Sequence, residues 1–183
     1  MFKETIFSIM NGEWEVGTEP ALEAIVQNEF DFGKDSVCAK QYNRIYNAQL
    51  HLAERLGGRD EDEDILTIVE ECEIIIQHVC FKAYDYGTRH PKLPVSYGFM
   101  DKKPFFRYEA GYDTTFTEPV EAWGNVSEAV SHLKRRLDAD GTDFDIQAIL
   151  KGYQFILYYL ARKMCGYGAY FKNDSTFISA LME

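Results

Sequence analysis

The sequence lacks the hydrophobic segments that place a chain in or across a membrane. No stretch approaches the roughly 18 consecutive apolar residues of a membrane span. The first ten residues include Lys3 and Glu4 and contain no long apolar run, so they do not have the pattern of a signal peptide. We therefore expect a cytoplasmic protein that makes no membrane contact.

Cysteine is scarce, and its spacing excludes the common cysteine-based sites. The sequence contains no CxxC pair of the kind that marks a zinc or redox site. The four cysteines are Cys38, Cys72, Cys80 and Cys165. Three of them fall in helical patterns, so we expect reduced thiols in the core of a cytosolic protein.

Basic residues are few relative to acidic ones. The chain has 19 Lys and Arg against 30 Asp and Glu, a formal charge of −11. A field of this sign repels nucleic acid and attracts basic surfaces, so we expect no direct nucleic-acid binding. Aromatic residues make up 15% of the chain, which is high, and Tyr and Trp often anchor protein interfaces. The composition therefore favours a globular protein that binds another protein.

Motifs of assembled active sites are also absent. No Walker loop, GxSxG, HExxH or GxGxxG occurs, so we expect neither enzymatic activity nor a cofactor. A small metal-dependent enzyme using His51 and His132 is the enzymatic alternative, but no Glu-x-x-His motif accompanies them. The acidic run 138–145 departs from the EF-hand pattern. We expect Asp62 and Asp143 to be helix caps, and no metal site.

What the sequence does contain is an internal repeat. Shifted by 81 residues, residues 41–87 align with residues 122–168 without a gap and give 13 identities in 47 pairs. Ordinary residue frequencies would give about three, and such self-similarity indicates a duplicated structural unit. The identical pairs are Ala48/Ala129, His51/His132, Leu52/Leu133, Arg55/Arg136, Leu56/Leu137, Asp62/Asp143, Asp64/Asp145, Ile65/Ile146, Ile68/Ile149, Ile75/Ile156, Lys82/Lys163, Tyr86/Tyr167 and Gly87/Gly168.

Each copy of the repeat has the apolar periodicity of two helices. In the first copy we expect helices over about 36–56 and 62–86, ended by Gly57-Gly58 and by Gly87. In the second copy we expect helices over 127–137 and about 144–165, the latter ended by Gly166 and Gly168. Short acidic joints connect the two helices of each copy, so each copy is predicted to be an antiparallel helical hairpin.

The remaining segments complete a mostly α fold. Short helices are expected over 2–10, from 18 to about 28, and over 176–182. Prolines and glycines between the hairpins predict an irregular aromatic linker with short strands or extended segments over 95–99 and 105–108. The fold class is thus duplicated antiparallel hairpins around a four-helix core, in one bundle or two lobes. The predicted divisions are 1–87 (N-terminal helices and first hairpin), 88–121 (linker) and 122–183 (second hairpin and C-terminal helix).

Two segments resemble a family of small uncharacterised helical proteins carried by prophages and mobile elements of Gram-positive bacteria. They are Phe7-Ser-Ile9-Met10-Asn11-Gly12-Glu13 and Phe81-Lys-Ala-Tyr84-Asp-Tyr86-Gly87, and the resemblance covers residues 2–87. The family implies a phage protein acting inside a bacterial host cell. Small, acidic phage proteins without catalytic motifs are often inhibitors of host machinery, and anti-CRISPR proteins are among them.

These observations lead to a hypothesis about function. We expect a non-enzymatic, acidic, phage-derived inhibitor that binds a nucleic-acid-handling host protein, specifically an anti-CRISPR protein that keeps a Cas9-type nuclease from DNA. The alternative is a self-associating helical scaffold that forms a homodimer through the C-terminal helix. The expected partner-binding residues are the acidic run Asp60, Glu61, Asp62 and Glu63, together with Glu70, Glu71, Glu73, Tyr158 and Tyr159, at which the two copies differ.

Overall fold

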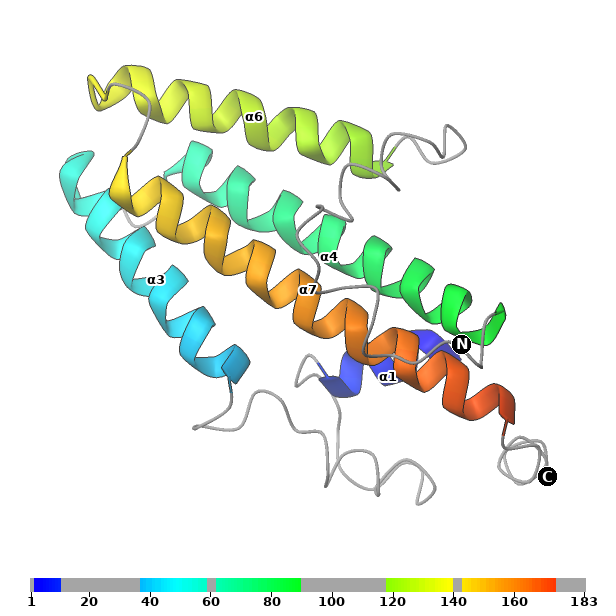
Figure 1. Cartoon of the computed structure of the whole chain (residues 1–183). Coiled ribbons are helices and arrows are strands. Elements are labelled where there is room, and N and C mark those ends of the chain that lie inside the picture. Colours follow the sequence, from blue (N-terminus) through cyan, green and yellow to red (C-terminus); the bar gives the residue numbers. More distant parts are fainter. Residues whose placement is uncertain (1, 11–36, 59–61, 90–117, 140–142, 174–183) are drawn as a thin grey trace. The chain divides into compact units, whose positions relative to one another are not determined.

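The computed structural model describes residues 2–10, 37–58, 62–89, 118–139 and 143–173, and all regular structure in these ranges is α-helical (Figure 1). The helices are α1 (Phe2–Met10), α3 (Val37–Arg55), α4 (Glu63–Arg89), α6 (Glu118–Arg136) and α7 (Phe144–Asn173). The predicted mostly α fold is confirmed for this part of the chain. The helices expected over 18–28 and 176–182, and the strands over 95–99 and 105–108, lie outside the described residues.

The chain divides into two compact units. Unit 1 comprises residues 1–40, 79–101 and 157–183, and unit 2 comprises residues 41–78 and 102–156. The division does not follow the repeat, because α4 and α7 each contribute their first part to unit 2 and their second part to unit 1. We call α3 with α4 repeat 1 and α6 with α7 repeat 2.

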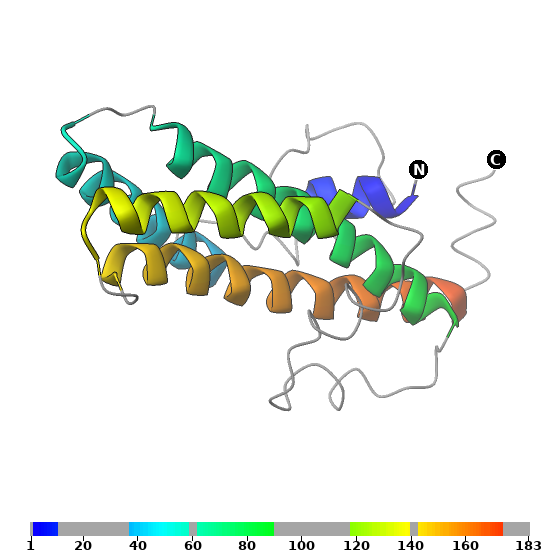
Figure 2. The same cartoon turned by 90° about the horizontal axis from the view of Figure 1, so that it is seen from above.

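Unit 2 is a four-helix arrangement in which each repeat pairs with the other. Figures 1 and 2 show α3 lying along α7 and α6 lying along α4. The α3–α7 pair is antiparallel, since His51 near the end of α3 meets Asp145 at the start of α7, while Tyr42 near its start meets Tyr153. The α6–α4 pair is also antiparallel, since Arg136 at the end of α6 meets Asp62 before α4, while Asn125 meets Glu71. The sequence predicted that the two helices of one copy would form a hairpin. The observed contacts instead join the first helix of each repeat to the second helix of the other.

The apolar stripes predicted from helical periodicity form the core of unit 2. Their buried members are Ile45, Ala48, Leu52, Ile65, Ile68, Cys72, Ile75 and Ile76 in repeat 1, and Val126, Ala129, Leu133, Ile146, Ile149, Tyr153 and Ile156 in repeat 2. The stripe positions Leu56, Val69, Val130, Leu137 and Leu150 are only half-buried. Identical or similar residues at equivalent positions therefore fill one shared core.

The first helix of each repeat ends in the same way. The backbone N–H of Gly58 donates to the carbonyl of Ala53 over 2.9 Å, and the equivalent N–H of Ala139 donates to Lys134 over 3.0 Å. This hydrogen bond is typical of a Schellman motif, in which the residue just before the donor has a left-handed backbone conformation. Gly57 fills that position in repeat 1 at φ 105°. Its counterpart Asp138 fills it at φ 49°, a region that Asp tolerates better than most residues.

The beginning of α6 was predicted wrongly. The sequence placed it at Ser127, after a linker that was taken to include Pro119, whereas the helix begins at Glu118. Proline is tolerated in the first turn of a helix, where its missing N–H has no intrahelical partner. Gly124 is tolerated inside the helix because its cost of about 1 kcal/mol is small beside tertiary packing.

The ends of α4 and α7 were also predicted wrongly, and the reason lies in unit 1. Gly87 and Gly168 were expected to end these helices, which instead continue to Arg89 and Asn173. A Cβ on Gly87 would lie 2.0 Å from the carbonyl oxygen of Cys165, and a Cβ on Gly168 would lie 2.1 Å from that of Tyr84. Both glycines therefore allow the backbones of α4 and α7 to touch where the helices cross. Gly166 also lies inside α7.

Helix α1 is attached to the second part of α4 within unit 1. The rings of Phe7 and Phe81 meet edge-to-face with their centroids 5.6 Å apart. Lys3 Nζ lies 2.9 Å from Asp85 Oδ2 and 5.5 Å from the Phe81 ring centroid. Ile6 and Met10 are fully buried, as the predicted amphipathic helix required, and Phe7 joins them. The side chains of Phe2 and Ile9, which were also placed on that face, lie outside the description.

The four cysteines are free and buried, as predicted. Burial raises the pKa of the Cys72 thiol to about 12 and also raises the pKa values of Cys80 and Cys165. A buried thiol with a raised pKa carries little thiolate and is therefore chemically inert. Among the described helices, none combines the length and apolarity that crossing a bilayer would require.

Candidate functional site

The most highly organised polar feature is a pair of charged clusters in unit 2. In the first, the Arg55 guanidinium at the end of α3 binds two carboxylates at the start of α7. Arg55 Nη2 lies 2.6 Å from Asp143 Oδ2, and Arg55 Nη1 lies 2.6 Å from Asp145 Oδ2. A further bond of 3.2 Å from Nη1 to Asp143 Oδ1 makes the Asp143 contact bidentate. Bidentate arginine–carboxylate pairs are among the stronger polar contacts in proteins.

The second cluster repeats the first, atom for atom, with the roles of the repeats exchanged. Arg136 at the end of α6 binds Asp62 and Asp64 at the start of α4. Its Nη2 lies 2.5 Å from Asp62 Oδ2, and its Nη1 lies 3.0 Å from Asp62 Oδ1 and 2.7 Å from Asp64 Oδ2. Because each repeat donates its arginine to the aspartates of the other, the contacts have the reciprocity of an isologous two-fold interface.

The bidentate aspartates also begin the helices that carry them. Asp62 Oδ1 accepts the backbone N–H groups of Asp64 and Ile65, and Asp143 Oδ1 accepts those of Asp145 and Ile146. The predicted helix-capping role is therefore confirmed. Hydrogen bonds from Arg136 and Arg55, respectively, are the main cause that lowers the pKa values of Asp62 and Asp143, and they outweigh the burial of these carboxyls.

These lowered pKa values predict acid-sensitive stability. A carboxyl whose pKa is lower in the folded than in the unfolded chain stabilises the fold above its unfolded pKa, about 3.9 for Asp. That contribution is lost as the pH falls through the folded pKa. We expect the urea midpoint to fall progressively between about pH 5 and pH 2. The decrease should be shallower in Arg55→Ala and Arg136→Ala variants, and an equally steep decrease in those variants would contradict this origin.

The two histidines that suggested a metal site belong to the same clusters. His51 Nδ1 lies 2.7 Å from Asp145 Oδ2, and His132 Nδ1 lies 3.3 Å from Asp64 Oδ1. Both imidazoles are largely exposed and each adds to an arginine–aspartate pair. In the described residues, no group of three or more His, Cys, Asp or Glu side chains is arranged to hold a metal ion.

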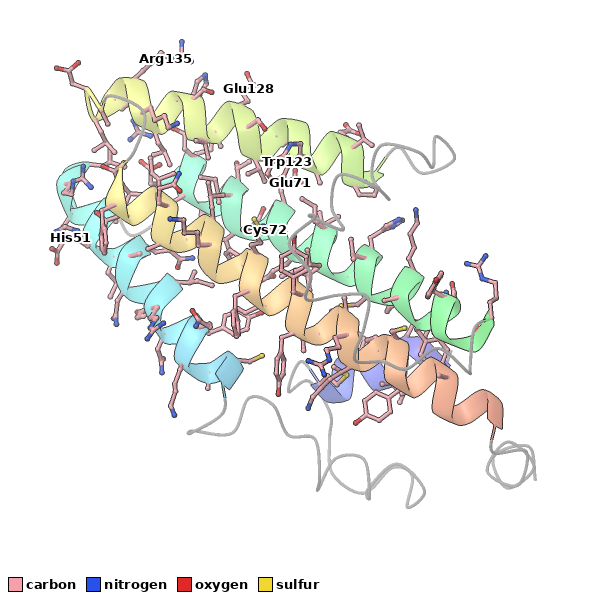
Figure 3. All side chains as sticks on the ribbon, in the orientation of Figure 1. His51, Glu71, Cys72, Trp123, Glu128 and Arg135 are labelled. Atoms are coloured by element: carbon pink, nitrogen blue, oxygen red, sulfur yellow. The ribbon has the colours of Figure 1, made fainter. Side chains whose placement is uncertain are left out.

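The structure places the expected partner-binding residues in different environments. Asp60 and Glu61 lie outside the described residues. Asp62 is buried and bound to Arg136, so it serves the scaffold and is not available to a partner. Glu71 is half-buried and accepts a 2.6 Å hydrogen bond from Asn125 Nδ2, between α4 and α6 (Figure 3). Tyr158 and Tyr159 on α7 are also half-buried.

The other three predicted residues, Glu63, Glu70 and Glu73, lie on one exposed face of α4. Two aliphatic side chains lie on that same face, because Leu66, Glu70 and Ile74 are spaced four residues apart. Leu66 is 41% exposed and Ile74 is 36% exposed. We call this surface the α4 face. It combines a strip of carboxylates with apolar anchors, and the first basic residue of α4 is Lys82, beyond it.

The equivalent face of α7 has a different character. The positions that match Glu70, Glu73 and Ile74 hold Lys151, Gln154 and Phe155, all exposed. The two repeats therefore share a core and a pattern of ion pairs, while their outer faces differ in charge.

No protein-family model, curated protein or solved structure matches the chain.

The charged clusters were not predicted, although the identical polar residues of the two repeats indicate them. From the sequence, Asp62 and Asp143 were predicted to be helix caps, and no contact was predicted for Arg55 or Arg136. The caps are confirmed, but the same aspartates also bind the arginine of the other repeat. Most matched surface positions hold different residues in the two repeats, but these polar positions hold identical ones. Such identity indicates a contact between the repeats.

Proposed function

We propose that the chain is a non-enzymatic binding protein whose α4 face occupies a basic surface of a nucleic-acid-handling protein. The observation that carries the proposal is the α4 face itself, where Glu63, Glu70 and Glu73 surround the exposed Leu66 and Ile74. Carboxylates steer an acidic protein toward a basic groove, and apolar side chains at the centre of a contact supply most of its binding energy. The formal charge of −11 strengthens the long-range attraction.

A protein of this kind acts by occupation. Once the carboxylates of the α4 face are seated on lysines and arginines that normally contact phosphates, the nucleic acid loses those contacts. Phosphate contacts provide most of the salt-dependent affinity for DNA, so their loss weakens binding whatever the DNA sequence. The specific candidate for the target is a Cas9-type nuclease, which holds nucleic acid in a positively charged channel. This candidate rests on the resemblance of residues 2–87 to phage proteins.

Competition for DNA tests the proposal. We expect the protein to displace a labelled target duplex from a purified, guide-loaded Cas9-type nuclease, and to do so less effectively as salt rises from 50 to 200 mM. The triple variant Glu63→Gln, Glu70→Gln, Glu73→Gln should need about tenfold more protein for the same displacement, because three exposed attractive contacts of a few tenths to 1 kcal/mol are lost. Fluorescence anisotropy of the duplex measures the effect.

The chain supplies a matched control for this change in charge. Glu121, Glu128 and Asp138 are exposed acidic residues of α6 and its C-terminal end (Figure 3 labels Glu128). Replacing them by Gln, Gln and Asn removes the same three charges and should change displacement by less than about twofold. Equal losses in the two triple variants would show that net charge alone acts, and would remove the α4 face as the site. Displacement that does not depend on salt would remove the electrostatic mechanism.

A further inference from the structure

We propose that two copies of this chain can exchange their repeats. Repeat 1 of one copy then pairs with repeat 2 of the other, through the same surface that joins the two repeats within one chain. The proposal concerns association of the chain with itself and goes beyond the proposed binding of a nucleic-acid-handling protein. It rests on the reciprocal contacts of unit 2 and on the equally reciprocal glycine crossing in unit 1.

The first step is that three kinds of contact between the repeats occur twice with the roles exchanged: the arginine–aspartate pairs, the histidine–aspartate pairs and the close approach at the glycines. Arg55 binds the aspartates of repeat 2, and Arg136 binds those of repeat 1. Gly87 approaches Cys165, and Gly168 approaches Tyr84, with the same offset of 81 residues. Such reciprocity is the defining property of the interface in a two-fold symmetric dimer. Repeat 1 and repeat 2 thus behave toward each other as two subunits do.

The second step is that the contacts do not depend on which copy supplies each repeat. Residues 90–117 form the covalent connection between Arg89 and Glu118. A connection of that length can reach roughly 90 Å when fully extended, so the bond between the repeats does not restrict pairing to one chain. Two chains that exchange their repeats regain every ion pair between the repeats and both glycine contacts twice. Exchange of identical elements is a low-cost route to a dimer.

The third step concerns concentration. A tethered repeat meets its own partner at an effective concentration in the millimolar range, so the single chain is favoured in dilute solution. A second copy competes during refolding at high protein concentration. It also competes when a repeat binds the repeat of another chain more tightly than the repeat of its own chain. Charge reversal produces this difference in affinity and makes the exchange measurable.

The experiment uses two full-length variants, Arg55→Glu and Asp145→Arg. Each variant reverses only one partner of the Arg55–Asp145 ion pair, so each places two like charges next to each other in that cluster. In an exchanged heterodimer, one interface is fully wild type. In the other, the arginine introduced at position 145 lies beside the glutamate introduced at position 55 and beside Asp143, so that cluster regains one positive and two negative charges, as in the wild type. We expect equimolar variants, unfolded and refolded together, to form a heterodimer that a tag on one variant retains and native mass spectrometry identifies.

Wild-type chain mixed with the Arg55→Glu variant is the matched control. In this mixture, one interface contains the glutamate introduced at position 55 opposite Asp145 whether or not the chains exchange. Exchange therefore gains no favourable ion pair. The variant pair should give about tenfold more heterodimer than this control, which corresponds to about 1.4 kcal/mol. If neither variant folds alone, recovery of helical circular dichroism on co-refolding supports the proposal. Equal retention in pair and control, or a mixture that gains no helix, would overturn it.

Discussion

Replacing Gly87 or Gly168 by alanine should destabilise unit 1 more than any other single methyl group added to the described chain. The new Cβ would lie about 2 Å from a backbone carbonyl oxygen of the opposing helix, and a backbone cannot rotate away as a side chain can. The helices α4 and α7 would have to separate at their crossing. Overpacking a tight core typically costs 1–3 kcal/mol, and we expect at least about 3 kcal/mol here. Urea denaturation of each variant measures the loss.

Gly124 provides the control for this prediction. It lies inside α6, and nothing lies within 4 Å of an added Cβ. Alanine at an exposed interior helical position is more favourable than glycine by about 0.5–1 kcal/mol. Gly124→Ala should therefore stabilise the protein slightly, while Gly87→Ala and Gly168→Ala destabilise it. Stabilisation of all three variants would show that the crossing is not close-packed.

Removing the arginine of either charged cluster should have the second-largest effect. The side chains of Asp143 and Asp145 are only 6% and 5% exposed, and Arg55→Ala removes their main counter-charge. Leaving a buried charge unpaired costs several kcal/mol, and partial exposure of Arg55 reduces this to about 2 kcal/mol. Arg136→Ala should cost somewhat less, because its partner Asp64 is 16% exposed.

The neighbouring arginine is the control for both variants. Arg135 is exposed on α6 (Figure 3), and its Nε donates to the backbone carbonyl of Ser131 in the same helix over 3.4 Å. Arg135→Ala should change the free energy of unfolding by less than about 0.5 kcal/mol. A loss as large as that of Arg55→Ala would indicate a general effect of net charge and not a specific pair.

The buried faces of the helices and the helix caps were predictable from the sequence, because they depend on residues that are close together in the chain. The spacing of Ile45, Ala48 and Leu52 determines which side of α3 is buried, whatever lies opposite. The acidic joints predicted helix caps because Asp62 and Asp143 immediately precede apolar periodic runs. Both features depend on residues within one turn of each other, and the sequence displays them directly.

The parts that were missed depend on contacts distant in sequence. A glycine near a helix end looks the same in sequence whether it ends the helix or, like Gly87, admits another backbone. The apolar stripes alone did not predict the pairing of α3 with α7, because an apolar stripe does not specify its partner. The candidate site was identified in part, since Glu63, Glu70 and Glu73 are exposed, while Leu66 and Ile74 were overlooked because apolar residues were assigned to the core.

The claim on which the account depends is that each repeat binds the other through its own arginine and the other's aspartates. Double-mutant cycles test it directly, using Asp64 and Asp145, which do not cap their helices. We expect a coupling energy of about 1–2 kcal/mol between Arg55 and Asp145, and between Arg136 and Asp64. The pairs within one repeat, Arg55 with Asp64 and Arg136 with Asp145, should be coupled by less than about 0.5 kcal/mol. Coupling that is as large within a repeat as between the repeats would contradict the reciprocal architecture.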